Sequence, residues 1–284
     1  MSFEGVYSVL PTPFRGAGDV DTESLKRVVE LIVGAGVNGV TALGVTGEAS
    51  RLNERERHLV VETVVKQVAG RAKVIVGASA DGVRTCIEYS REAKSLGAAA
   101  VMVSPPRALK LNTESVVNHY KALAEAVDLP IVVQDYPPIS GFAMEAGLLA
   151  RIAKEIPSAR TIKLEDPPTP FKTARILAAA GDTRVAILGG LGGVFLLEEL
   201  MAGAAGVMTG FAYPEVLVNV VTLYRAEWKG DKLSITSATT YSQDRKLDQV
   251  MVWSLDDKGQ LIIELTQTLT GQPTRTMRLV HRKQ

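Results

Sequence analysis

The sequence is poor in the residues that build disulfide frameworks and metal sites. Among its 284 residues there is one cysteine, Cys86, and the three histidines, His58, His119 and His281, lie far apart. A single cysteine cannot form an internal disulfide, and the spacing of the histidines matches no common metal-ligand pattern. We therefore expect a protein of a reducing compartment whose chemistry uses no metal.

The chain also lacks an excess of one charge and a long apolar segment. Its 32 Lys and Arg residues balance 31 Asp and Glu residues. Proteins that bind nucleic acids or acidic membranes usually carry a basic excess, so neither is an expected partner. No run of 18 apolar residues is present, and the first residues lack the basic and apolar regions of a signal peptide. These absences predict a soluble, cytoplasmic protein.

Short runs of β-branched and apolar residues recur along the first four-fifths of the chain. They are separated by amphipathic segments, at the spacing of one strand-loop-helix-loop unit. The eight predicted strands are residues 6–10, 39–43, 74–77, 100–103, 131–134, 161–164, 185–188 and 206–209.

Helix signals lie between these runs. Asp21 precedes a segment whose apolar residues recur every three to four positions, Asn53 and Glu56 have the spacing of a capping box, and Pro214 can begin a last helix. No G-x-G-x-x-G pattern follows the first strand. We therefore predict a closed (β/α)8 TIM barrel over residues 3–228, in preference to an open doubly wound sheet.

The texture of the sequence changes after Trp228. Residues 229–284 are rich in Thr, Val and Ile, alternate in polarity and are divided by turn residues. This pattern predicts a small antiparallel β-rich tail of four strands. Because about 55 residues make a poor independent core, the tail should pack on the barrel or on a partner chain, or be only marginally stable.

Reactive residues of such a barrel project from the C-terminal ends of its strands. On the sixth predicted strand, period-two alternation directs Lys163 into the barrel. A buried lysine tends to lose its proton, and the neutral amine can then attack a carbonyl group to form a Schiff base. The alternative is a structural ion pair with Glu165 or Asp166.

Other polar groups follow neighbouring strands. The glycine-rich loop with Thr46 and Gly47 offers a hydroxyl and backbone N–H groups to a carboxylate. Arg107 can bind a carboxylate, and Tyr136 can transfer protons. The alternatives are a solvated arginine and a tyrosine that packs in its loop.

Several of these motifs together resemble the dihydrodipicolinate synthase / N-acetylneuraminate lyase superfamily of class I aldolases and dehydratases. The resemblance covers residues 3–228. It is carried by Pro-Thr-Pro-Phe at 11–14, Gly-Val-Thr-Gly-Glu at 44–48 with Leu52 and Glu56, Ser104-Pro105, residues 137–141, Ile162-Lys163 and Gly206-Val207-Met208. The last 55 or so residues do not match the helices with which that family normally continues.

The resemblance implies a cofactor-independent reaction. Lys163 would form an imine with a small 2-oxo acid, Thr46 would lie near the substrate carboxylate, and the backbone of Met208 would meet the same end of the substrate. The family also implies a homo-oligomer, a dimer or a tetramer.

Four positions depart from dihydrodipicolinate synthase itself. Val45 replaces a threonine, Gln134 and Arg107 replace tyrosines, and Ile139 replaces the arginine that grips the second substrate. These changes argue against synthesis of dihydrodipicolinate.

The sugar-acid dehydratase branch is the more similar one. Residues 133–137, Lys163 to Glu165 and Met208 to Gly210 carry this likeness. It implies dehydration or aldol cleavage of a 2-keto-3-deoxy sugar acid, in which Glu165 removes a proton from the imine of the substrate and Gln134 binds the substrate. Alternatives are condensation of pyruvate as in 4-hydroxy-tetrahydrodipicolinate synthase, a non-catalytic barrel that binds a small oxo acid and, more distantly, a phosphate site at Gly189 to Gly193.

Overall fold

Residues 3–224 form a closed barrel of parallel strands surrounded by helices. The computed structural model describes residues 3–224, 227–229, 232–242, 245–256 and 260–281. Eight strands pair in sequence order, and the eighth returns to the first, so that the predicted TIM barrel is confirmed. They are β1 Gly5–Val9, β2 Gly39–Ala42, β3 Lys73–Gly77, β4 Ala100–Val103, β5 Ile131–Asp135, β6 Thr161–Leu164, β7 Ala186–Gly189 and β8 Gly206–Thr209.

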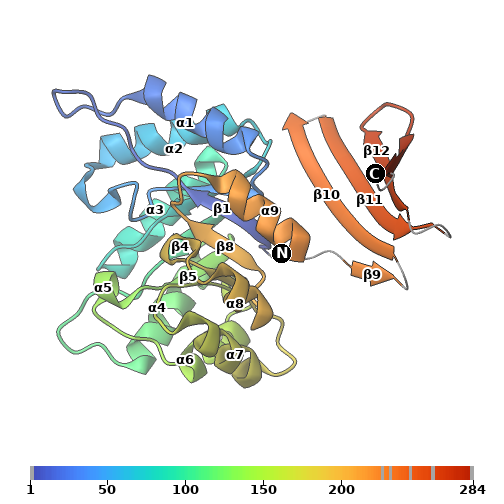
Figure 1. Cartoon of the computed structure of the whole chain (residues 1–284). Coiled ribbons are helices and arrows are strands. Elements are labelled where there is room, and N and C mark those ends of the chain that lie inside the picture. Colours follow the sequence, from blue (N-terminus) through green and yellow to red (C-terminus); the bar gives the residue numbers. More distant parts are fainter. Residues whose placement is uncertain (1–2, 225–226, 230–231, 243–244, 257–259, 282–284) are drawn as a thin grey trace.

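Helices follow the strands and surround the barrel (Figure 1). The helices are α1 Thr22–Gly34, α2 Glu54–Val68, α3 Val83–Leu96, α4 Thr113–Ala126, α5 Pro137–Ser140, α6 Ala146–Glu155, α7 Thr169–Ala180, α8 Leu196–Met201 and α9 Pro214–Tyr224, with 3-10 turns η1 Ala49–Arg51, η2 Pro157–Ala159 and η3 Leu191–Gly193.

The predicted caps fix where the first helices begin. The side chain of Asp21 accepts a hydrogen bond from the Ser24 N–H at the start of α1. Asn53 and Glu56 form a complete capping box at the start of α2. Each cap satisfies backbone N–H groups that the first turn of a helix leaves without a partner.

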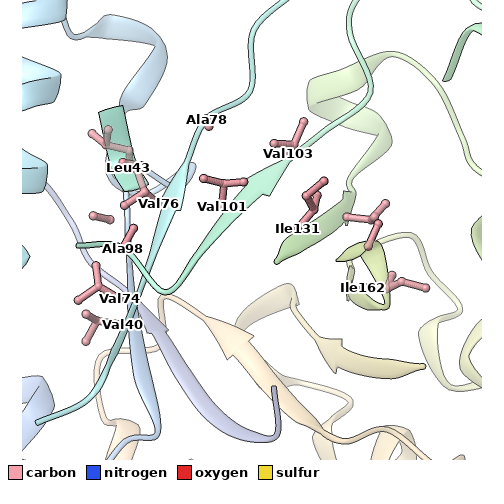
Figure 2. Packing of buried hydrophobic residues seen from close by; sticks show 14 of the residues in the cluster. Val40, Leu43, Val74, Val76, Ala78, Ala98, Val101, Val103, Ile131 and Ile162 are labelled. Carbon is pink, nitrogen blue, oxygen red and sulfur yellow. The ribbon is translucent and has the colours of Figure 1, made fainter. Parts of the chain in front are cut away.

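Alternate strand residues face outward and form the larger hydrophobic core with the helices. This layer holds Val40, Val74, Val76, Val101, Val103, Ile131 and Ile162 (Figure 2). The residues between them face inward and fill the barrel. The inner cluster consists of Phe3, Tyr7, Val9, Ile75, Ala100, Met102, Val132, Leu188 and Met208. The filled interior leaves the strand ends as the place for a site.

The C-terminal segment forms an antiparallel sheet in the order β13-β12-β11-β10-β9. Its strands are β9 Glu227–Lys229, β10 Lys232–Ser242, β11 Arg245–Leu255, β12 Leu261–Leu269 and β13 Arg275–His281. The last four coincide with the predicted strands. β9 was not predicted, because three residues are too few to show an alternating pattern. Among the turn residues that divide the tail in the sequence, those at 257–259 lie outside the described residues.

One strand of the sheet comes close to the barrel, because β10 meets α9 (Figure 1). The three placements considered for the tail stay predictions.

Candidate active site

Lys163 lies on β6, in register with Gln134 of β5 and Leu188 of β7. It is 3% exposed, in agreement with the predicted inward phase of this strand. Burial lowers the pKa of Lys163, and the nearby carboxylate of Glu165 opposes this effect without cancelling it. A larger fraction of Lys163 is therefore neutral at a given pH than of a lysine at the surface.

Glu165 connects Lys163 to a chain of polar side chains. Its Oε2 lies 3.1 Å from Nζ of Lys163 and accepts a hydrogen bond of 2.8 Å from Nε2 of Gln134. The amide oxygen of Gln134 accepts a hydrogen bond of 3.0 Å from the Ser104 hydroxyl. The ion pair expected as the alternative to a reactive lysine is thus present, with Glu165 as the partner. It leaves a carboxylate in contact with the amine, where a general base can act.

Two glycines at the C-terminal end of β7, Gly189 and Gly190, give the buried carboxylates room. A Cβ on Gly190 would lie 2.3 Å from Cγ of Glu165, and one on Gly189 would lie 1.7 Å from Oε2 of Glu199. Neither position tolerates a side chain without displacing its neighbour. Close packing thus accounts for these two glycines of the stretch considered for phosphate.

The glycine-rich loop after β2 lies beside the C-terminal end of β8. Thr46 is exposed, and a Cβ on Gly210, just after β8, would lie 3.0 Å from Cγ2 of Thr46. The N–H of Gly47 donates to the carbonyl of Gly44, and the Gly47 carbonyl accepts from the Thr12 hydroxyl at 2.7 Å. The N–H of Glu48 is also used within the loop. The N–H groups of Gly47 and Glu48 therefore have partners within the loop, and the binding of a carboxylate by Thr46 and Gly47 stays a prediction.

The remaining predicted residues occupy different depths. Met208 is fully buried in the inner cluster. Tyr136 is partly buried and precedes α5, because β5 ends at Asp135. Arg107 is exposed and pairs with Asp81, which binds its guanidinium and its backbone N–H. Substrate roles for these three stay predictions.

A second ionic cluster on the outer side of β5 and β6 was missed by the sequence analysis. Nζ of Lys172, on α7, lies 2.6 Å from Oδ2 of Asp135 and 2.7 Å from Oδ2 of Asp166. Asp135 is fully buried, and burial raises its pKa while Lys172 opposes the rise. The alternation of β5 contained one signal, because it directs Asp135 away from Gln134 and the barrel interior.

Within the described part of the chain, no three His, Cys, Asp or Glu side chains gather as a metal ion would require. None of its helices is both long and apolar enough to cross a membrane.

Comparison with known proteins adds the family. Residues 2–277 match the Dihydrodipicolinate synthetase family. The chain is 34% identical over 224 residues to the L-2-keto-3-deoxyarabonate dehydratase of Azospirillum brasilense, covering 78% of this chain and 72% of that protein. It is 32% identical to an uncharacterized DapA-like lyase of Rhizobium meliloti, covering 98% and 90%. Among solved structures, dihydrodipicolinate synthase from Rhodopseudomonas palustris matches with a TM-score of 0.73 and 34% identity, over 78% of this chain and 75% of that one.

These matches differ in how far they extend into the tail. The family model continues to residue 277, whereas the arabonate dehydratase and the solved structure each cover 78% of the chain. The described tail residues form a sheet, in agreement with the expectation that the helices with which the family normally continues are not found there. The chain therefore belongs to the Dihydrodipicolinate synthetase family and is a lyase of that family.

Proposed function

We propose that the chain acts on a 2-oxo acid through an imine on Lys163. The observation that carries this proposal is the burial of Lys163 at the end of β6, which lowers the pKa of its amine. A neutral amine attacks the C2 carbonyl, and loss of water gives the imine. Burial of an ammonium group is costly, so a lysine that served only as a structural cation would be more stable at the surface.

Glu165 is the proposed base of the next step. The imine acidifies the C3 protons of the substrate. Nζ of Lys163 would be bonded to C2, so a Glu165 carboxylate 3.1 Å from Nζ lies close to the adjacent C3. When Glu165 takes a C3 proton, the C–H electron pair forms the C3–C4 double bond and the C4–O bond breaks. The departing hydroxide leaves as water after receiving a proton. Hydrolysis of the imine then frees Lys163, so these steps require no cofactor.

The neighbouring groups have supporting roles. Gln134 donates to Glu165 and accepts from Ser104, which fixes the direction of its amide and keeps the carboxylate beside the amine. We assign the substrate carboxylate to Thr46, next to Gly47, and to the backbone at Met208. Tyr136, at the end of β5, is the proposed proton carrier for the leaving group.

For the substrate we propose a 2-keto-3-deoxy sugar acid that is dehydrated. The likeness to the arabonate dehydratase supports this class. Ile139 supports it as well, because an apolar, partly exposed side chain cannot hold the carboxylate of a second substrate. The matches to dihydrodipicolinate synthases keep condensation of pyruvate as the second candidate.

The assay compares the two candidates directly. The protein is incubated with five- and six-carbon 2-keto-3-deoxy acids, and in parallel with pyruvate and aspartate semialdehyde. We expect loss of water from a deoxy acid and little consumption of the semialdehyde. Efficient condensation would contradict the reading of Gln134 and Ile139, and binding of an oxo acid without turnover would indicate a non-catalytic barrel.

We also propose that the protein is a homo-oligomer. Four large apolar side chains, Leu197 and Met201 of α8 and Val216 and Leu223 of α9, are about half exposed or more. Apolar surface of this kind often marks a protein interface. Light scattering of the full chain should give a mass of at least two copies, and the mass of one copy would contradict the proposal.

A further inference from the structure

Arg57 is a buried cation whose hydrogen bonds go to backbone carbonyls. It lies on α2 and is 7% exposed. Its Nη1 donates to the Ala49 carbonyl at 3.2 Å, its Nη2 donates to the Gly77 carbonyl at 3.0 Å, and its guanidinium stacks on Tyr89 at 4.2 Å. Because burial of a charged group is costly, an arginine in this position needs a structural reason.

Both carbonyls belong to segments that hold the Thr46 loop. Ala49 follows Glu48, and a Cβ on Gly77 would lie 1.9 Å from the carbonyl oxygen of Leu43. Leu43 and Glu48, which flank the loop, have positive φ angles of 56° and 53°. Residues other than glycine adopt this conformation only where the surrounding structure enforces it.

We propose that Arg57 is a positioning residue that braces the Thr46 loop in the shape that receives the substrate carboxylate. The inference rests on the proposed function, because it needs Thr46 to bind that carboxylate. Arg57 acts through the carbonyls of Ala49 and Gly77 and does not itself contact substrate. The Thr12 hydroxyl holds the middle of the loop through Gly47, so the two residues fix different parts of one turn.

The test measures affinity for a carboxylate without requiring the physiological substrate. Pyruvate is titrated in the presence of borohydride, and the concentration that gives half-maximal adduct on Lys163 is read by mass spectrometry. For Arg57→Met we expect this concentration to rise about tenfold or more, with the same maximal labelling. The control is Arg55→Met, which removes an exposed arginine from the same helix and should leave it unchanged.

A double variant separates a brace from a general loss of stability. Thr46→Val should weaken pyruvate binding by removing the hydroxyl. If Arg57 acts through this loop, Arg57→Met adds little to the effect of Thr46→Val, because the group that it positions is already gone. Independent effects that multiply in the double variant would overturn the proposal.

Two further results keep the inference and the proposed function distinguishable. If Arg57→Met fails to fold by far-UV circular dichroism, Arg57→Lys replaces it. A lysine lacks the planar fork that serves two carbonyls, so we expect about threefold weaker binding, and unchanged binding would overturn the brace. If the wild-type protein gives no adduct, both proposals are overturned. If the wild type is labelled and Arg57→Met reaches half-maximal adduct at the same pyruvate concentration, only the inference is overturned.

Discussion

Two lysine–carboxylate clusters lie on opposite sides of the same pair of strands. Inside the barrel, Lys163 contacts one carboxylate, that of Glu165, which an amide also holds. Outside it, Lys172 lies between two carboxylates, those of Asp135 and Asp166. The Glu165 N–H donates to the Asp135 carbonyl, so the clusters are joined by one backbone hydrogen bond.

The difference between the clusters is one of solvation and charge balance. Lys163 is 3% exposed with a single acidic neighbour, and burial dominates its pKa. The Lys172 side chain is 12% exposed, has two acidic neighbours and ties α7 to the ends of β5 and β6. Under the proposed function, we expect the inner cluster to serve chemistry and the outer one to serve stability.

The largest expected effect is on turnover. Glu165→Gln keeps the size of the side chain but removes the proposed base, so dehydration should slow by about 10²- to 10⁴-fold. Imine formation on Lys163 should persist, because the amine itself is untouched. Steady-state kinetics and borohydride trapping measure the two steps separately. Full dehydration activity in this variant would show that another group takes the proton.

The outer cluster should affect stability most. Lys172→Met leaves Asp135 buried without its counter-charge and should lower the free energy of unfolding by about 3–5 kcal/mol. Since burial raises the pKa of Asp135, this deficit should be present at neutral pH and shrink as pH falls toward the ordinary aspartate pKa of about 3.9. Urea unfolding at several pH values measures it.

The control for that variant is Lys154→Met. Its ammonium donates to the Ala179 carbonyl at the surface, and its loss should change stability little. If the two variants lowered the free energy of unfolding equally, the claim that the outer cluster is important for stability would be contradicted.

A smaller effect is expected where Glu165 meets β7. Gly190→Ala places a Cβ 2.3 Å from Cγ of Glu165 and must displace that side chain. Misplacement of a catalytic group by about 1 Å can slow a reaction by about 10²-fold. Gly147→Ala is the matched control, since its Cβ would meet no atom within 4 Å on helix α6. Dehydration rates of the two variants should therefore differ, and similar rates would contradict this account of Gly190.

The smallest effect is a shift in a pH profile. Imine formation needs the neutral amine, so its rate should rise with pH through the pKa of Lys163 and have a midpoint below 10.5. Because Glu165 raises the pKa of Lys163, Glu165→Gln should move the midpoint to lower pH. Rapid-quench trapping across pH measures it. A shift to higher pH would contradict the assigned interaction between the two groups.

Much of the barrel could be predicted because its signals are local. The side chains of Asp21 and Asn53 each cap the helix that begins at the next residue by accepting from an N–H group three residues along the chain. Alternation on a four-residue strand was enough to predict that Lys163 points inward. The prediction of the five-stranded tail was less complete, because β9 has only three residues and shows no alternating pattern.

The side-chain partnerships across separate βα units could not be predicted. Arg57 meets the Gly77 carbonyl, Arg107 meets Asp81, and Lys172 meets Asp135, at separations of 20, 26 and 37 residues. Such pairings depend on how the helices pack on the barrel. No spacing within one segment encodes them.

The central claim is that Lys163, and not Lys172 of the outer cluster, carries the substrate. Wild-type protein and the Lys163→Ala, Lys163→Arg and Lys172→Met variants are treated with a 2-keto-3-deoxy acid and borohydride, and peptides are mapped by mass spectrometry. We expect one reduced adduct on Lys163 in the wild type and in Lys172→Met, and none in either Lys163 variant, because arginine stays protonated. An adduct on another lysine, or none in the wild type, would contradict the account.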